Sequence, residues 1–275
     1  MQRFPIIELF SSIQGEGRYA GVPSIFVRTS GCNLRCVFSS SICDTPYSSF
    51  YPEKSKYSYN DLLKIIRDNP QIKHIVITGG EPMMYREGLL ELLVEIDKAV
   101  AEEKQLTIET NATCRPLSKE ELSVLKKLKL SLYSLSPKLR NSLPNADDTI
   151  KLPNGETRSF SSEEIQRLDA IRYRPDLLAE YLAGDIAVQI KFVYNSEYTT
   201  CIGDIDCLLA DTEEILKDKV FCYQSIKEAC MLMPEGNSEE SLSSSRKQAV
   251  SVCVERGWRY TDRLHITIWG DKRGV

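Results

Sequence analysis

Three cysteines, Cys32, Cys36 and Cys43, fall within the stretch GCNLRCVFSSSICDTPY, directly after the apolar run from Ser24 to Val27. The run stops at the polar residues 29–31, a pattern typical of a buried strand that opens into a loop. Thiolates are the ligands of iron–sulfur clusters, and a cubane closed by protein takes one thiolate per iron. Three thiolates in one loop would leave one iron free to chelate a small molecule.

Two other interpretations of the cysteines stay open on spacing alone. A structural zinc usually takes four Cys or His ligands in two spaced pairs, but the histidines of this chain, His74 and His265, are far from the loop in sequence. Disulfides would leave one thiol of the loop unpaired. The other cysteines show no metal-type spacing and are expected to be core or surface thiols; they are Cys114, Cys201, Cys207, Cys222, Cys230 and Cys253.

Apolar periodicity predicts strands that alternate with helices over most of the chain. The predicted strands after the first are 74–78, 105–109, 131–136, 187–194, 229–233 and 265–269. The predicted helices are 58–69, 88–101, 118–129, a stretch around 163–182, and 238–256. This alternation is typical of a parallel sheet built from βαβ units. About six such strands are too few for a closed eight-stranded barrel, so we predict an α/β fold with a partial TIM-like barrel.

The polar signatures GCNLRC, TGGEP, ETN and SPK each stand where a predicted strand stops. Sites of such sheets lie at the carboxyl-terminal ends of the strands, so these signatures should meet at one rim. The loop Gln14–Gly17, QGEG, precedes the first strong strand and by itself is typical of a surface loop. We predict a single domain over residues 1–275, with a long loop insertion at about 140–162 that leaves the rim and forms a lid.

The net charge of −4 gives no indication of nucleic-acid or membrane capture. No stretch approaches eighteen consecutive apolar residues, and the first residues lack the apolar core of a signal peptide. We therefore expect a cytosolic protein whose nine cysteines are free or metal-bound.

Taken together, QGEGRYAGVPSIFVRTSGCNLRC, CDTPY, ITGGEP, ETN and SPK resemble the radical S-adenosylmethionine (SAM) enzymes, and within them the 7-carboxy-7-deazaguanine synthase family. GGEP alone would specify only the superfamily, whereas QGEG before the cysteines and CDT after them are more specific. The matching signatures span Gln14 to Lys138, with weaker matches near His265.

The resemblance implies a [4Fe–4S] cluster on Cys32, Cys36 and Cys43, with SAM on the fourth iron. Gly79, Gly80 and Glu81 would approach the amino acid part of SAM, with Glu81 accepting from its ammonium group. Further groups for the ribose and carboxylate would come from Glu109, Thr110, Asn111, Ser136 and Lys138.

The substrate implied by the resemblance is 6-carboxy-5,6,7,8-tetrahydropterin, which loses ammonia to give 7-carboxy-7-deazaguanine for the queuosine pathway. Arg28 would clamp its carboxylate, and Gln14, Glu16 and Thr78 would bind the rest. The resemblance also implies Mg²⁺ on Thr45, an electron donor such as flavodoxin or ferredoxin, and a homodimer.

Three features depart from the family pattern. The gap between the second and third cysteines is six residues, Val37–Ile42, where two are usual, and we expect the extra residues to bulge outward. Met233-Pro234-Glu235 stands where relatives often have Gln before Pro. The carboxyl-terminal stretch HITIWGDKRGV is longer than in short relatives, where the terminal carboxylate reaches the substrate, so that role is doubtful for Val275.

Two other functions compete with this reading. A radical SAM activase, which makes a glycyl radical on a partner protein, shares the cluster and GGEP, but it needs an open groove for a polypeptide. A zinc-stabilised binding module without catalysis would be colourless. QGEG, Arg28 and CDT favour a small substrate.

Overall fold

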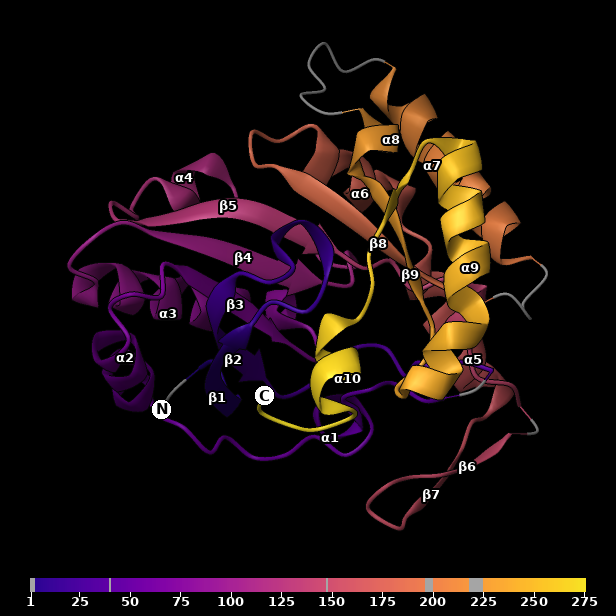
Figure 1. Cartoon of the computed structure of the whole chain (residues 1–275), viewed down its shortest axis with the longest axis horizontal. Coiled ribbons are helices and arrows are strands. Elements are labelled where there is room, and N and C mark those ends of the chain that lie inside the picture. Colours follow the sequence, from indigo (N-terminus) through magenta and orange to yellow (C-terminus); the bar gives the residue numbers. More distant parts are fainter. Residues whose placement is uncertain (1–2, 40, 147, 196–199, 218–224) are drawn as a thin grey trace.

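The computed structural model describes residues 3–39, 41–146, 148–195, 200–217 and 225–275. In this part of the chain an eight-stranded sheet has the order β1-β2-β3-β4-β5-β8-β9-β10 (Figure 1). Neighbouring strands are parallel except β1 and β2, which are antiparallel. The strands are β1 (Ile6–Ile13), β2 (Pro23–Thr29), β3 (His74–Gly79), β4 (Lys104–Thr110), β5 (Leu128–Leu135), β8 (Val188–Tyr194), β9 (Cys230–Pro234) and β10 (Arg259–Tyr260).

The predicted partial barrel is confirmed. The described residues show no pairing between the outermost strands β1 and β10, so the sheet does not close. The long parallel strands are β2, β3, β4, β5, β8 and β9, and β10 adds a two-residue edge. β2 and β3 are buried along nearly their whole length, because parallel sheets are covered on both faces.

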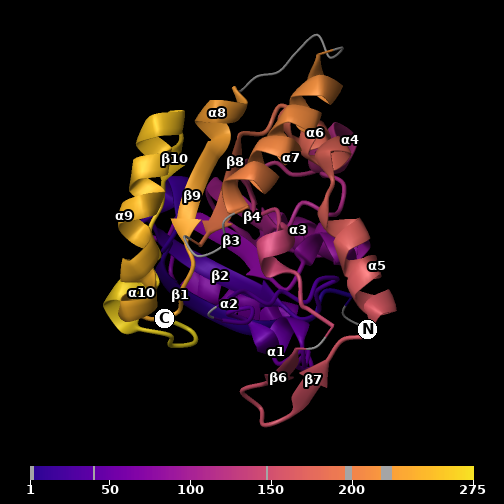
Figure 2. The same ribbon diagram turned by 90° about the vertical axis from the view of Figure 1, so that its right-hand side faces the viewer.

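Helices follow most of the parallel strands and pack against the sheet, with α9 beside β9 (Figures 1 and 2). The helices are α1 (Pro46–Ser49), α2 (Tyr59–Asp68), α3 (Arg86–Ala99), α4 (Lys119–Leu122), α5 (Ser162–Arg172), α6 (Pro175–Leu182), α7 (Cys201–Leu216), α8 (Ile226–Ala229), α9 (Glu239–Arg256) and α10 (Leu264–Trp269). None of the helices in the described ranges is long and apolar enough to cross a membrane.

The helix predicted over 118–129 is wrong beyond its first turn. A capping box between Ser118 and Glu121 starts α4, but the helix ends at Leu122. The carboxylate of Asp97, on α3, accepts hydrogen bonds from the backbone N–H groups of residues 126, 127 and 128 at 2.6 to 2.9 Å. These bonds hold the backbone in the extended form that begins β5, so tertiary contacts override local helix propensity.

Two further predictions need correction. The single stretch around 163–182 is divided into α5 and α6 because Pro175 opens a new helix and disfavours helical backbone at the residue before it. The strand predicted over 265–269 is the helix α10, which ends at Trp269 and is followed by Gly270 with positive φ. The last strand of the sheet is instead β10. In the described sheet, residues 265–269 have no strand beside them to form hydrogen bonds with, so their apolar pattern does not produce a strand. The helix α7 was not predicted.

In its described residues, the segment 140–162 contains the antiparallel hairpin of β6 (Thr149–Lys151) and β7 (Thr157–Ser159), which projects from the body in Figure 1. Its far end returns to a small apolar cluster formed by Leu34, Cys36, Phe160 and Leu168. The insertion therefore packs against the cysteine loop, apart from the main core between the sheet and the helices.

Candidate functional site

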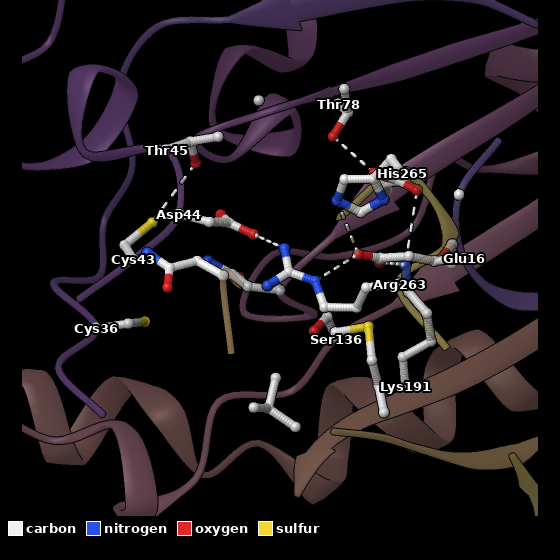
Figure 3. A pocket seen from close by; sticks show the side chains of 18 of the residues that line it. Glu16, Cys36, Cys43, Asp44, Thr45, Thr78, Ser136, Lys191, Arg263 and His265 are labelled. Atoms are coloured by element: carbon white, nitrogen blue, oxygen red, sulfur yellow. Dashed lines mark hydrogen bonds and ion pairs between the residues drawn. The ribbon is translucent and has the colours of Figure 1, made fainter. Parts of the chain in front are cut away.

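Side chains from the carboxyl-terminal ends of the parallel strands line one cavity (Figure 3). Alternate residues of a strand point to opposite faces, so Ile190 and Phe192 of β8 enter the main core while Lys191 between them faces the cavity. Likewise, Ile108 of β4 is in the core and Glu109 faces the cavity. All residues predicted for the site except Glu81 line this cavity: Gln14, Glu16, Arg28, Cys32, Cys36, Cys43, Thr45, Thr78, Gly79, Gly80, Glu109, Thr110, Asn111, Ser136 and Lys138.

A small hairpin brings the second and third cysteines together across their six-residue gap. Val37 and Ile42 form an antiparallel bridge, and the N–H of Cys43 donates to the carbonyl of Cys36 at 2.9 Å. This pairing keeps the two ends of the six-residue gap side by side.

The described extra residues, 38, 39 and 41, do not bulge outward, and that prediction is wrong for them. Ser39 accepts a hydrogen bond from Asn195 Nδ2, after β8, and Ser41 donates to Glu235 at 3.3 Å, after β9. Phe38 lines the cavity. Residues 39 and 41 therefore point across the rim toward β8 and β9, because polar side chains at the ends of those strands form hydrogen bonds with them.

The donor set of the cysteine loop fits an iron–sulfur cluster. The N–H of Leu34 donates to Cys32 Sγ at 3.4 Å, and Asn111 Nδ2 lies 3.8 Å from the same sulfur. Burial raises the pKa of the Cys32 and Cys43 thiols, and the nearby Cys36 adds to the rise. Bound iron would offset the unfavourable free energy of deprotonating these buried thiols, because its positive charge stabilises thiolates. Soft sulfur donors with N–H groups beside them are the usual setting of such clusters.

Thr45 lies at the start of α1, where its Oγ1 is 3.5 Å from Cys43 Sγ. Its carbonyl accepts from the backbone N–H of Ser48 at 2.9 Å, which fixes the turn. In the described ranges, no three side chains of His, Cys, Asp or Glu lie close enough together to hold a single metal ion such as Mg²⁺. Magnesium at Thr45 stays a prediction.

The GGEP signature after β3 passes very close to the cysteine loop. A Cβ at Gly80 would collide with the carbonyl oxygen of Gly31, so only glycine allows the two backbones to approach. The N–H of Glu81 then donates to that carbonyl at 2.8 Å. This contact fixes the cavity wall beside Cys32.

Glu81 lies behind the wall and not in the cavity. Its side chain is 0% exposed, and its carboxylate accepts from Thr110 Oγ1 at 2.7 Å and from the N–H groups of Asn111 and Met83 at 2.7 and 3.0 Å. Burial raises the pKa of Glu81 to about 6, although these hydrogen bonds oppose the rise. In this structure Glu81 joins the ends of β3 and β4, and the backbone of residues 79 and 80 faces the cavity in its place.

Strongly paired charges occupy the side of the cavity away from Cys36 and Cys43 (Figure 3). Glu16 pairs with Lys191 Nζ at 2.8 Å and with Arg263 Nε at 3.3 Å, and His265 Nε2 lies 4.0 Å away. Burial raises the pKa of the Glu16 carboxyl, but Lys191 and Arg263 outweigh it and hold this pKa well below its usual range. Arg263 also pairs with Asp44, next to Cys43, at 2.5 Å.

The backbone of the QGEG loop packs closely against these paired charges and the helix α10 that carries His265. A Cβ at Gly15 would collide with the ring of His265, so glycine allows α10 to lie against the loop. The carbonyl of Gly15 accepts from the N–H of Leu264 at 2.9 Å. Gln14 Nε2 donates to Glu109 at 3.1 Å, and Thr78 Oγ1 donates to the other oxygen at 2.7 Å. The loop thus lies in the site and is more than a surface loop.

Arg28 faces the cavity but already has an acidic partner. Its Nε lies 2.5 Å from Glu8, and the same carboxylate accepts from Tyr47 at 3.0 Å. Glu8 also pairs with Arg273 at 2.6 Å, whose guanidinium lies over the Tyr47 ring at 3.4 Å. These contacts fasten the carboxyl-terminal tail, and Val275 lines the cavity despite the longer tail.

Several cavity residues were missed by sequence reasoning, notably Asp44, Lys191 and Arg263. Lys191 had a usable signal, since a lysine inside the buried run VQIKFVY needs an acidic partner. Arg263 had no comparable signal, because its position depends on α10 folding back over β1. All cysteines that the structure describes are unpaired; Cys222 lies outside the described residues.

Comparison with known proteins identifies relatives along nearly the whole chain. A family model described as the radical SAM superfamily matches residues 26–146. A 7-carboxy-7-deazaguanine synthase from Halobacterium salinarum is 33% identical over 97% of this chain and 91% of its own length. One from Rhodopirellula baltica is 34% identical over 98% of this chain and 88% of its own length.

The fold also has a solved counterpart. A chain in the crystal structure of QueE from Escherichia coli superposes with a TM-score of 0.52 at 23% identity, covering 95% of this chain and 94% of that one. At this identity the likeness concerns the fold alone.

Proposed function

This chain belongs to the 7-carboxy-7-deazaguanine synthase family of radical SAM enzymes, and from this premise we propose how its cavity converts 6-carboxy-5,6,7,8-tetrahydropterin to 7-carboxy-7-deazaguanine with loss of ammonia. The observation that carries the proposal is the shared cavity, with the loop thiols Cys36 and Cys43 on one side and paired charges on the other. Such an arrangement places a redox cofactor next to a polar substrate.

Cys32, Cys36 and Cys43 hold a [4Fe–4S] cluster in this proposal, and SAM binds beside it. The bound cluster and SAM supply one-electron chemistry that begins with removal of a hydrogen atom from the substrate. The chain contributes position and exclusion of water. The backbone of Gly79 and Gly80 lines the part of the cavity next to Cys32, and Lys138, which donates to the Ser136 carbonyl at 3.1 Å, is held over the end of β5.

SAM further contacts Glu109, Thr110, Asn111 and Ser136 in this proposal, because all four line the cavity at the ends of β4 and β5. Glu109 also accepts from Gln14 and Thr78, so it joins the SAM side to the substrate side. Glu81 does not contact SAM in this proposal; it supports the cavity wall by joining the ends of β3 and β4 through its hydrogen bonds.

The substrate lies against the charged side. Gln14, Glu16 and Thr78 present hydrogen-bonding groups there, and Arg28 faces the same space. Since Glu8 takes the Nε of Arg28, the end of the guanidinium is left for a substrate carboxylate. Lys191 and Arg263 keep Glu16 ionised, which makes it an acceptor for N–H groups of a pterin ring.

We extend the proposal to Mg²⁺ on Thr45, whose hydroxyl lines the cavity and whose oxygen is a hard ligand. The reduction needs an external one-electron donor such as flavodoxin or ferredoxin. The proposed assembly is a homodimer of single-domain chains.

The test is turnover by anaerobically reconstituted protein. Protein supplied with dithionite, SAM and 6-carboxy-5,6,7,8-tetrahydropterin should give the ultraviolet spectrum of the deazaguanine product, and reactions lacking either SAM or the pterin should not. Brown protein that cleaves SAM but leaves the pterin unchanged would reject the substrate assignment. Colourless protein with tightly held zinc would reject the enzyme class.

A further inference from the structure

Arg172 is a buried arginine that reaches a cysteine of the proposed cluster from the insertion side. It is the last residue of α5 and is only 3% exposed. Its Nη1 lies 3.9 Å from Cys36 Sγ and donates to Ser142 Oγ at 2.6 Å, while Nη2 donates to the carbonyl of Arg35 at 3.2 Å. The Ser142 hydroxyl and the Arg35 carbonyl are neutral, and the Cys36 sulfur carries a negative charge only when it is deprotonated to the thiolate.

No carboxylate of the described residues forms an ion pair with Arg172. Its Nε is also buried without a hydrogen-bond partner. Arginine keeps its charge in proteins, and a buried charge is costly unless an opposite charge accompanies it. The other buried cations near the cavity, Lys191 and Arg263, each have acidic partners. Among the described residues, Arg172 therefore has no anionic partner until a thiolate forms beside it.

The surroundings make this charge effective. Cys36 belongs to the small apolar cluster with Leu34, Phe160 and Leu168, and the last residues of the insertion build the far side of that cluster. Charges act more strongly on each other where apolar groups exclude water.

We propose that Arg172 is the internal counter-ion of the iron–sulfur cluster and raises its reduction potential; the inference rests on the proposed function. A [4Fe–4S]²⁺ core with three thiolates carries a net negative charge. An electron taken from an external one-electron donor makes that charge more negative by one. A fixed positive charge and an N–H donor beside Cys36 stabilise the reduced form more than the oxidised form, which raises the potential.

The proposal assigns a role to the 140–162 insertion and to the helix that follows it. Ser142 accepts from Arg172, and the carbonyl of Ser142 accepts from the N–H of Val37 at 3.0 Å. The helix α5 thus brings the counter-ion to the cluster loop, while the insertion holds it through Ser142 and closes the apolar side of the loop.

The decisive measurement is the midpoint potential of the reconstituted cluster, followed by electron paramagnetic resonance during a titration. Arg172→Met should lower the equilibrium constant for reduction about tenfold, which for one electron is about 59 mV. Arg172→Lys should stay near the wild-type value because it keeps the charge. Arg167→Met is the matched control, since Arg167 is an exposed arginine on the same helix. The midpoint potential of the cluster in this variant should equal that of wild type.

A wild-type potential in fully loaded Arg172→Met would overturn the inference while leaving the proposed function intact. Wild-type protein that binds no cluster would overturn both. If Arg172→Met does not fold, Arg172→Gln keeps an N–H donor without the charge, and its potential should also fall, by less than tenfold in the equilibrium constant; an unchanged potential in fully loaded Arg172→Gln would contradict the proposal.

Thermal denaturation separates this role from a structural one. Loading with iron and sulfide should raise the melting temperature of wild type and Arg167→Met by more than that of Arg172→Met. A purely structural role would lower the melting temperatures of the apo and loaded forms of Arg172→Met equally, and that result would contradict the proposal.

Discussion

The backbone N–H of Cys43 donates to the carbonyl of Cys36 at 2.9 Å, so the second and third cysteines are neighbours in a hairpin although six residues separate them. The bridge between Val37 and Ile42 extends this pairing by one step. The longer gap is therefore compatible with a shared cluster, and Cys43 takes the position that the CDT signature indicates.

Cys43→Ala should lose the cluster or hold it poorly and should not cleave SAM, because the cubane would lack one of its protein ligands. Iron and sulfide per chain, measured after anaerobic reconstitution, test this. Cys207→Ala is the control, since Cys207 is exposed and outside the cavity, and it should bind about four iron as wild type does. A full complement of iron in Cys43→Ala would show that another thiol is the ligand.

Deletion of residues 38–41 should preserve the cluster. The deletion joins Val37 to Ile42, which are already bridge partners, and it restores the usual two-residue gap. It also removes Phe38 from the cavity and the Ser41 contact to Glu235, so substrate affinity should fall while iron content stays normal. Loss of iron from the deletion variant would mean that the hairpin is needed to place the thiols.

Arg28→Ala should weaken binding of the pterin more than binding of SAM. Loss of a charge-assisted contact to the substrate carboxylate should cost about 2 to 5 kcal/mol if the contact is buried. Separate calorimetric titrations with the two ligands measure the difference. Arg3→Ala, which removes an exposed arginine paired with Glu87, should leave both affinities unchanged. Equal losses for both ligands in Arg28→Ala would place Arg28 in the scaffold around Glu8.

Thr45→Ala should lower turnover and flatten its dependence on Mg²⁺ without loss of iron. The hydroxyl is the proposed hard ligand, whereas the backbone carbonyl that fixes α1 stays in place. Activity measured across a magnesium series, with iron content determined in the same samples, gives the answer. A magnesium response identical to that of wild type would remove Thr45 from the metal site.

The rim of the site could be predicted because it depends on local rules. Strand periodicity and the polar residues that end each run place Cys32, Gly80, Asn111 and Lys138 at the same edge of a parallel sheet, whatever the details of packing. The resemblance to a known family then gave these residues chemical roles that spacing alone left open.

The rest depends on contacts between distant parts of the chain. The extension of β5 is set by Asp97 from another helix, and the helix α10 exists where local propensity favours a strand. The pairing of Arg263 with Glu16 and Asp44 requires the tail to return to the first strand, and Arg172 reaches Cys36 only through the fold of the insertion. Periodicity contains no information on such long-range choices.

The remaining prediction concerns the stability of the apo protein in acid. His74 is 2% exposed, and its ring nitrogens bond to Ser24 Oγ at 2.7 Å and Thr107 Oγ1 at 2.8 Å, which links β2, β3 and β4. Burial lowers the pKa of His74 to about 4 from an ordinary value of 6.5. The neutral ring therefore stabilises the fold above pH 6.5, and this contribution is lost as the pH falls toward 4, because the unfolded chain takes up the proton first.

Wild type should lose about 3 kcal/mol more of its free energy of unfolding between pH 6.5 and 4 than His74→Gln does, from about 1.4 kcal/mol per pKa unit. Urea denaturation of both apo proteins at a series of pH values measures this difference. Glu81, whose pKa burial raises to about 6, acts in the opposite direction, but it is present in both proteins and cancels. Parallel pH profiles for the two proteins would show that the His74 ring is protonated in the fold as readily as in the unfolded chain.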